Sequence, residues 1–209
     1  MSTPALRWIR PQLNENARAK ALAAISHAER DRYDATPEAQ QESFLAGRLV
    51  LRRLASELLG TEPELVDLVA VCPDCGGPHG RPVIPGSNLH LSLSRSDDAV
   101  VAAASWDAPV GVDLERVDQP AETLAAIGSI GGEESVLRWT RIEAILKADG
   151  RGLRVDPAEV SIASVDGELQ GWVQGSAERY RLSEVELAAD VRVSVAVRAL
   201  RQPRHGSTE

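Results

Sequence analysis

Alternating apolar and polar residues mark several strands of this chain. The clearest alternation runs over residues 191–197, where every second residue is valine. Residues 89–94 and 110–115 follow the same period of two, and residues 99–105 form a short apolar run between two polar turns. The last three segments predict an antiparallel meander. Residues 5–9 predict a further short strand.

Helical spacing of apolar residues marks three other segments. Residues 14–30 are rich in alanine and begin with an asparagine suited to capping, which predicts one helix. Residues 37–59 predict a second helix, with Gly60 placed to end it. Its Arg48, Arg52 and Arg53 we interpret as a solvated face. Residues 133–149 predict a third helix, which the following glycines end.

Each half of the chain thus combines a long helix with short antiparallel strands. The later strands are expected at residues 160–162, 172–173 and 180–182, ahead of the valine-rich strand. The natural interpretation is an α+β fold of two similar lobes. We place the first lobe at residues 1–105 and the second at residues 106–201. The polar tail over residues 202–209 is expected to be disordered.

Composition excludes several classes of protein. The 209 residues are 43% hydrophobic and 26% charged, which is ordinary for a globular protein, and the formal net charge is −8. This acidic balance argues against bulk nucleic-acid binding, which needs a basic surface. No apolar run could span a bilayer and no secretory signal is visible, so we expect a cytoplasmic protein. A site for an anionic ligand would have to gather its cations locally.

The two cysteines lie in the segment Cys72-Pro73-Asp74-Cys75, with His79 close behind. A structural zinc site usually has four ligands, and the chain holds no second cysteine pair. We therefore interpret the segment as a loop without metal. The alternative is a loop stiffened by zinc, with His79 and His90 as further ligands.

Three acidic residues are the most informative candidates for chemistry. Asp113 and Glu115 are two apart on a predicted strand, so they share a face of it. Glu143 lies on the third predicted helix, with Lys147 one turn later. If that helix packs on the strand, three carboxylates and one ammonium can converge. Three carboxylates suit Mg²⁺, which proteins commonly bind together with substrate phosphates.

Four motifs, two of which contain these residues, strengthen this hypothesis. They are Gly-Arg-Pro at residues 80–82, Leu-Ser-Leu-Ser-Arg-Ser at residues 91–96, Gly-Val-Asp-Leu-Glu at residues 111–115, and the segment at residues 139–153. In order and spacing they resemble the 4′-phosphopantetheinyl transferases of the larger, single-chain, surfactin-synthetase-activating type. That family transfers the phosphopantetheine arm of coenzyme A to a serine of an apo acyl or peptidyl carrier protein, and releases adenosine 3′,5′-bisphosphate. It serves fatty acid, polyketide or nonribosomal peptide biosynthesis.

The resemblance implies a pseudo-dimeric fold of two similar lobes, Mg²⁺ as cofactor, and coenzyme A bound between the lobes. It assigns the metal ligands to Asp113, Glu115 and Glu143. Glu143 would also accept the proton of the carrier serine, and Lys147 would neutralise the pyrophosphate. The residues implied for coenzyme A binding are Gly80, Arg81, Pro82, Ser92, Ser94, Arg95 and Lys147. Because two lobes in one chain can build this site, a monomer is expected.

The sequence also departs from the family. Arg95 replaces a histidine, Ile142 replaces a lysine, and residues 38–42 lack the arginines that reach the nucleotide in the family. These departures motivate two alternatives: a non-catalytic module that binds carrier proteins, or another Mg²⁺-dependent phosphoryl-transfer enzyme. For docking of an acidic carrier we expect hydrophobic contact or a local basic patch, such as Arg138, Arg141 and Arg151.

Overall fold

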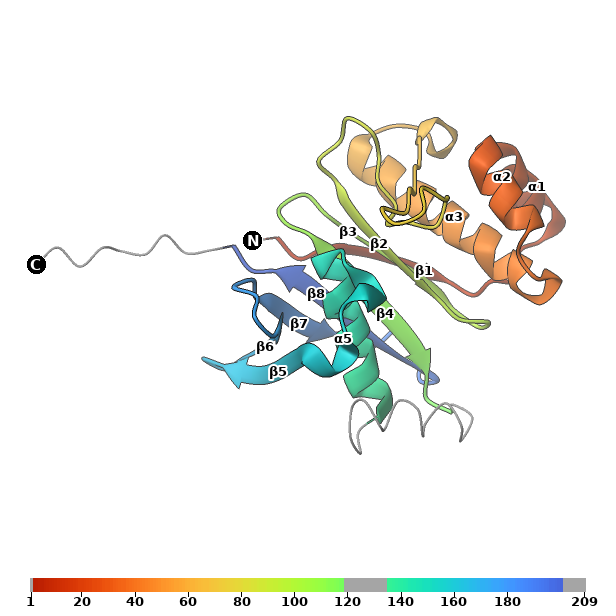
Figure 1. Ribbon diagram of the computed structural model, residues 1–209. Helices are drawn as coiled ribbons and strands as arrows, with labels where there is room; N and C mark the ends of the chain where they lie inside the picture. Colours follow the sequence, from red (N-terminus) through yellow and green to blue (C-terminus); the bar gives the residue numbers. More distant parts are fainter. Residues whose placement is uncertain (1, 119–134, 201–209) are drawn as a thin grey trace, which may run out of the picture.

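The chain folds into antiparallel sheets covered by helices (Figure 1), which confirms the predicted α+β class. The structure is a computed structural model that describes residues 2–118 and 135–200. Its helices are α1 (Glu15–Ala24), α2 (His27–Asp34), α3 (Glu38–Leu59) and α5 (Ser135–Asp149). Its strands are β1 (Ala5–Ile9), β2 (His90–Arg95), β3 (Val100–Ser105), β4 (Val110–Arg116), β5 (Val160–Val165), β6 (Glu168–Val173), β7 (Tyr180–Glu184) and β8 (Val191–Arg198).

The first sheet has three strands in the order β1-β3-β2, and both pairs are antiparallel. Helix α3 covers one face of it, because its apolar residues interlock with every second residue of β2 and β3. Gly60 ends α3 in the left-handed conformation, with φ 68°, as predicted. Helices α1 and α2 lie beside α3 (Figure 1).

The second sheet has five strands in the order β4-β8-β7-β6-β5, and α5 packs across it. Gly111 allows the helix to approach β4 closely. A Cβ at this position would lie 2.0 Å from the carbonyl oxygen of Ala144 on α5. Since β4 pairs with β8, the predicted meander was wrong in its third strand. The apolar side chains of β4 contact those of β3 in one core cluster, although the two strands share no backbone ladder. β4 therefore packs against the first sheet while it belongs to the second.

The core is divided into layers that match this arrangement. One cluster lies between α3 and the first sheet, a second joins β3 to β4 and β8, and a third lies beneath α5. The alternation of β4 produces two of these layers: Val110, Val112 and Leu114 belong to the cluster between the sheets. The residues between them, including Asp113, therefore face α5.

Side chains, rather than a backbone ladder, join β2 to β4. The hydroxyl oxygen of Ser92 accepts a hydrogen bond from the backbone N–H of Val112 at 3.0 Å. Arg81 donates to the carbonyl of Leu91 at 3.2 Å and to that of Val110 at 2.9 Å, so one guanidinium bridges both strands. We call this line of contacts the seam, because it is where the two sheets meet.

The predicted helix over residues 14–30 is wrong in its length, because the chain breaks it into α1 and α2. Ser26 begins α2 with a capping box, in which its hydroxyl accepts from the backbone of Glu29 and the Glu29 carboxylate accepts from the backbone of Ser26. These reciprocal bonds satisfy backbone donors that would otherwise lack a partner, so they favour a new start over a continuous helix.

The remaining sequence predictions divide into confirmed and open ones. The strands expected at the C-terminal side are all present and are longer than predicted. The two sheets fall on either side of the boundary proposed at residue 105, but the division into lobes stays a prediction. The tail over residues 202–209 lies outside the described residues. Within the described part, no helix is both long and apolar enough to cross a bilayer.

Candidate functional site

A compact network of three polar side chains lies where β2, β4 and α5 meet. Ser94 donates a hydrogen bond to Oδ1 of Asp113 at 2.8 Å. The Nζ of Lys147 donates to the same Oδ1 at 2.5 Å and to the Ser94 hydroxyl at 3.1 Å. Asp113 is only 4% exposed, so this charge is almost wholly removed from solvent. Its second oxygen, Oδ2, is buried without a hydrogen-bond partner among the described residues.

The local folding explains why these residues converge. On β4 the apolar residues face β3, so Asp113 faces α5. On α5 the residues Ile142, Ile145 and Leu146 are fully buried beneath the helix. Lys147 is one helical turn beyond Glu143, and both are half-buried at the edge of this core. The predicted meeting of Asp113 with Lys147 is therefore confirmed.

The pKa of Glu143 is affected by two charged residues of this network, Lys147 and Asp113. Burial raises the pKa of its carboxyl above the usual value; the nearby Lys147 opposes this rise and the charge of Asp113 adds to it. Glu115 is half-buried on the same strand as Asp113. The three carboxylates are not gathered as tightly as a metal would hold them, because they do not form a group with all ligand atoms within 4.8 Å of one another. The two groups close to Asp113 Oδ1 are Lys147 and Ser94 instead.

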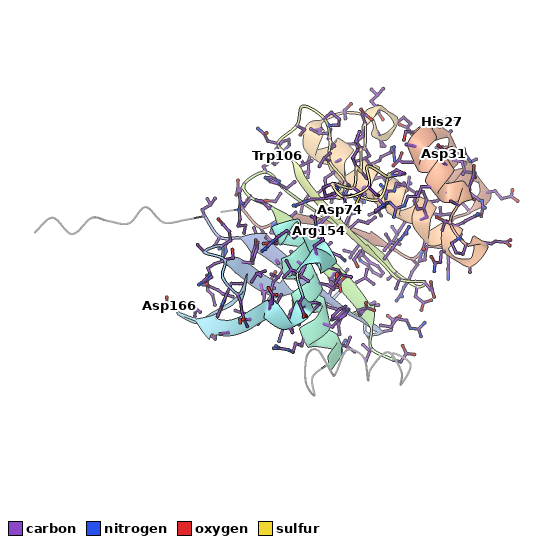
Figure 2. The ribbon with its side chains drawn as sticks, in the orientation of Figure 1. His27, Asp31, Asp74, Trp106, Arg154 and Asp166 are labelled. Atoms are coloured by element: carbon purple, nitrogen blue, oxygen red, sulfur yellow. The ribbon has the colours of Figure 1, made fainter. Side chains whose placement is uncertain are left out.

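A pocket of about 570 Å³ opens beside Lys147, between the two sheet-and-helix units. One wall is the turn after α5, which contributes Gly150, Arg151 and Gly152. The opposite wall comes from the segment before β2, with the predicted residues Gly80, Arg81 and Pro82, and from Ser92 on β2 itself. The two walls are joined by an ion pair between Asp74 and Arg154 at 3.1 Å, which lie side by side in Figure 2.

Arg81 and Gly80 have structural duties as well as a place in the pocket. Burial lowers the pKa of Arg81, and its guanidinium is held by the two carbonyls of the seam. A Cβ at Gly80 would lie 2.1 Å from the carbonyl oxygen of Val71, so the chain needs glycine there. Ser92 likewise lines the pocket while its hydroxyl accepts from the backbone of Val112. These residues build the pocket wall by joining strands.

Ser94 and Arg95, both implied by the resemblance for coenzyme A binding, lie on opposite faces of β2. Successive residues of a strand point to opposite faces, and Ser94 faces Asp113 on α5's side. Arg95 lies on the α3 side, with its Cζ 5.3 Å from the centre of the Phe44 ring. The role that the resemblance implies for both residues in binding coenzyme A stays a prediction.

Arg95 instead belongs to a cluster that the sequence interpretation missed. The Cζ atoms of Arg48 and Arg32 lie 5.1 Å and 5.7 Å from the same Phe44 ring, in cation–π contact. We call Arg32, Arg48, Arg52 and Arg95 the arginine cluster. The interpretation of Arg48 and Arg52 as a solvated face was wrong, because they are 6% and 3% exposed. The available signal was spacing, since residues 44, 48 and 52 lie on one stripe of a helix.

Glu29 supplies the negative charge of this cluster. Its carboxylate pairs with Arg52 at 2.6 Å and with Arg48 at 3.5 Å. Burial lowers the pKa of Arg48 to about 10; Glu29 opposes this shift and the charges of Arg32 and Arg95 reinforce it. The Nε atoms of Arg48 and Arg52 are buried without a partner among the described residues. The cluster thus holds more positive than negative charge, an arrangement complementary to an anion.

Two departures from the family motif acquire a structural meaning. Ile142 is fully buried in the core beneath α5, so it supplies packing and is not a cation missing from the pocket. Residues 38–42 hold no arginine, and the arginines that contact Phe44 come from α2 and from deeper in α3, as Arg32 and Arg48.

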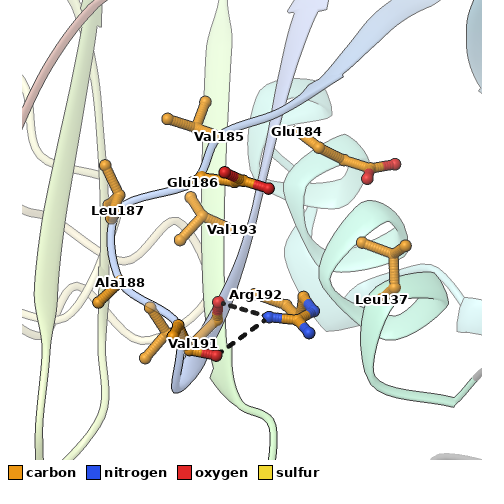
Figure 3. Close-up of a pocket in the computed structure, with 10 residues that line it drawn as sticks. Leu137, Glu184, Val185, Glu186, Leu187, Ala188, Val191, Arg192 and Val193 are labelled. Atoms are coloured by element: carbon orange, nitrogen blue, oxygen red, sulfur yellow. Dashed lines mark hydrogen bonds between the residues drawn. The ribbon is translucent and has the colours of Figure 1, made fainter.

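A second hollow, of about 640 Å³, lies on the far end of α5 (Figure 3). Leu137 of the helix faces the loop between β7 and β8 across it, and Val185 and Leu187 line that loop. Of the expected basic patch, Arg141 pairs with Glu184, and Arg151, in the turn after α5, pairs with Asp149 at 2.5 Å. The Nε of Arg138 is buried without a hydrogen-bond partner among the described residues. The lining of this hollow mixes apolar side chains with the charged residues Glu184, Glu186 and Arg192.

Comparison with known proteins assigns no family to these features. No protein-family model matches the chain, and no curated protein is a significant match to it. The candidate site is therefore defined by the positions and contacts of its residues alone.

Proposed function

We propose that this chain is a Mg²⁺-dependent 4′-phosphopantetheinyl transferase of the two-lobed type, acting on coenzyme A and the serine of an apo carrier protein. The observation that carries the proposal is the buried network of Ser94, Asp113 and Lys147, which reaches the pocket through Lys147. It joins, at one point, three of the four motifs on which the family resemblance depends. The fourth motif, at residues 80–82, forms the opposite wall of the same pocket.

The residues fit a divalent metal in their chemistry. Asp113 has a buried carboxylate oxygen without a hydrogen-bond partner among the described residues, which is costly unless something binds it. Glu143 and Glu115 would join Asp113 as ligands, and hard oxygen donors are what Mg²⁺ prefers. When bound, the metal would neutralise charge on the phosphate oxygens of the substrate. Lys147, which now neutralises Asp113, would then be available to the pyrophosphate.

Side chains in the pocket and beside it can accept the proton and neutralise the leaving group. The carrier serine oxygen forms a bond to the pantetheine-side phosphorus as the pyrophosphate P–O bond breaks, and adenosine 3′,5′-bisphosphate leaves. Glu143 can accept the serine proton, because its raised pKa makes it a better base than an exposed carboxylate. Lys147 and Arg151 contribute positive charge where the leaving group departs. The arginine cluster offers a separate anion site for another phosphate of the co-substrate.

A carrier panel tests the proposal directly. The chain is incubated with coenzyme A, Mg²⁺ and several apo carrier proteins, and each carrier is weighed by mass spectrometry. We expect the mass of one phosphopantetheine group to appear on a carrier serine. Failure to modify any carrier at stoichiometric enzyme would overturn the proposal. Binding of a carrier without transfer would favour a non-catalytic module, and release of nucleotide without carrier modification would favour a hydrolytic enzyme.

Variants assign the chemistry to the site. Asp113→Asn and Glu143→Gln should each slow transfer by about 100-fold or more, because each removes an oxygen that neutralises or accepts charge in the reaction. Asp166→Asn is the matched control, since Asp166 lies in the exposed turn between β5 and β6, far from the pocket in Figure 2. Near-full activity in either site variant would show that the metal assignment is wrong.

A further inference from the structure

Three side chains that commonly bind zinc lie close together in the turn at residues 72–79. Cys72, Cys75 and His79 are, within the described residues, the group of at least three cysteine, histidine or acidic side chains whose ligand atoms all lie within 4.8 Å of one another. Nε2 of His79 is 2.9 Å from Sγ of Cys75. For tetrahedral zinc, bond lengths of about 2.3 Å to sulfur and 2.0 Å to nitrogen imply ligand separations of about 3.5–3.8 Å. The three side chains therefore need only small movements to accept an ion.

The backbone of this turn brings the two cysteines close together and directs an N–H group at one sulfur atom. Gly76 has φ 71°, a conformation that other residues rarely adopt, and its N–H donates to the carbonyl of Cys72 at 2.9 Å. The N–H of Gly77 points to Sγ of Cys75 at 3.4 Å. A Cβ at Gly77 would lie 3.1–3.2 Å from the side chains of Cys75 and His79, so glycine leaves room for the ligands.

We propose that Cys72, Cys75 and His79 bind one Zn²⁺ ion through two thiolates and one imidazole nitrogen, with water in the fourth position. Both cysteines are free thiols, and two thiolates balance the charge of the ion. His90, the further ligand considered from the sequence, does not belong to this group. Asp74 is not part of the group: its Oδ1 pairs with Arg154, and its Oδ2 accepts from the Cys72 thiol at 3.9 Å.

The ion would clip the tip of a hairpin that builds the pocket. Val69 and Val83 pair as an antiparallel bridge, with hydrogen bonds of 3.0 Å and 2.8 Å, and we call the segment between them the 69–83 hairpin. Its return arm carries Arg81 to the seam directly after His79. Arg32 of α2 also donates to the carbonyl of Pro78 at 2.8 Å. Zinc would thus fix the loop that separates the pocket from the arginine cluster.

This site is independent of the transferase proposal and needs its own experiment. The chain is purified without chelator, and bound metal is measured by mass spectrometry of the elements. We expect about one zinc per chain, as for other sites with cysteine and histidine ligands. Cys75→Ser and His79→Asn should lose most of it. His27→Asn and His90→Asn are the controls and should keep it, because His27 is exposed on α2 and neither residue belongs to the ligand group.

Cobalt reconstitution of the unmodified chain provides a second measurement that does not depend on the folding of a variant. Tetrahedral Co²⁺ with two thiolates should give intense visible bands and a sulfur-to-metal charge-transfer band. Chelation of the zinc should increase backbone hydrogen exchange within residues 69–83 more than elsewhere. A folded chain without zinc and without a cobalt spectrum would overturn the proposal. So would a Cys72–Cys75 disulfide in protein purified under reducing conditions, or unchanged zinc in His79→Asn.

Discussion

The two halves of the molecule each contain a charged centre, and the two centres are opposite in sign. In each half a long helix packs on an antiparallel sheet, and a charged centre lies at the edge of that packing. The arginine cluster beside α3 has several guanidinium groups and the carboxylate of Glu29. The network beside α5 has Asp113 and the nearby Glu143 with the ammonium of Lys147. Each centre therefore contains a counter-charge but not a full balance.

This difference shows how an acidic protein can bind an anion. The formal net charge of −8 disfavours anions at the surface as a whole. Burial concentrates the cations of the first half in a place where water screens them poorly, so a local attraction survives. The carboxylates of the second half favour a cation instead. A ligand that carries phosphates together with a divalent metal would complement both centres, and the 69–83 hairpin lies between them.

The largest expected effect comes from removing the carboxylate of the first half. Glu29→Gln keeps the size of the side chain but leaves Arg48 and Arg52 buried without their counter-charge. Breaking a buried pair in this way should cost about 3–5 kcal/mol of stability. Chemical denaturation at pH 7 measures it. Glu57→Gln removes an exposed partner of Arg7 and should cost less than about 1 kcal/mol. Equal losses in the two variants would show that the arginine cluster does not depend on Glu29.

A second test compares how closely each helix approaches its sheet. Gly111→Ala would place a methyl group 2.0 Å from the Ala144 carbonyl, so α5 must move away from β4; we expect a loss of about 3 kcal/mol. Gly47→Ala in α3 meets the flexible end of Leu93 at 3.0 Å and gains helix propensity worth up to about 1 kcal/mol. It should be nearly neutral. If Gly111→Ala were equally mild, the packing of α5 on β4 would be looser than the structure indicates.

The sequence predicted these two centres unequally. Asp113 and Lys147 could be placed because strand alternation and helical spacing are local rules, and packing of α5 on β4 was the one assumption needed. The pairing of β4 with β8 could not be predicted, because a strand pattern fixes which face is apolar but not which neighbour covers it. The arginine cluster was missed for a different reason: arginines are seldom buried, so Arg48 was assigned to the surface despite sharing a stripe with Phe44.

The third prediction tests the arginine cluster as the anion site. Arg95→Gln should weaken the binding of adenosine 3′,5′-bisphosphate about tenfold, since it removes one charged hydrogen-bond donor worth about 1.5 kcal/mol. Isothermal calorimetry measures the affinity. Arg53→Gln on the same helix as Arg48 is the matched control, because Arg53 is exposed and should leave the affinity within about twofold. A similar loss in both variants would mean that net charge alone attracts the nucleotide.

The smallest expected effect concerns the ionisation of Glu143. Burial raises the pKa of this carboxyl in the folded chain, so the folded state binds its proton more tightly than the unfolded state. The contribution of Glu143 to stability is therefore fully present below the unfolded pKa and is lost as pH rises through the folded pKa. Glu143→Gln cannot ionise and avoids that loss. It should be more stable than the parent at pH 7, by an amount that shrinks towards zero as pH falls below the usual pKa of glutamate.

Chemical denaturation of both proteins across this pH range, without added metal, measures the difference. Glu168→Gln on β6 is the control, because that exposed side chain should give a flat difference at every pH. A parent chain that is the more stable of the two at pH 7 would show that Lys147 more than offsets the burial of Glu143. The second centre would then be balanced, and the contrast with the arginine cluster would hold for the first half alone.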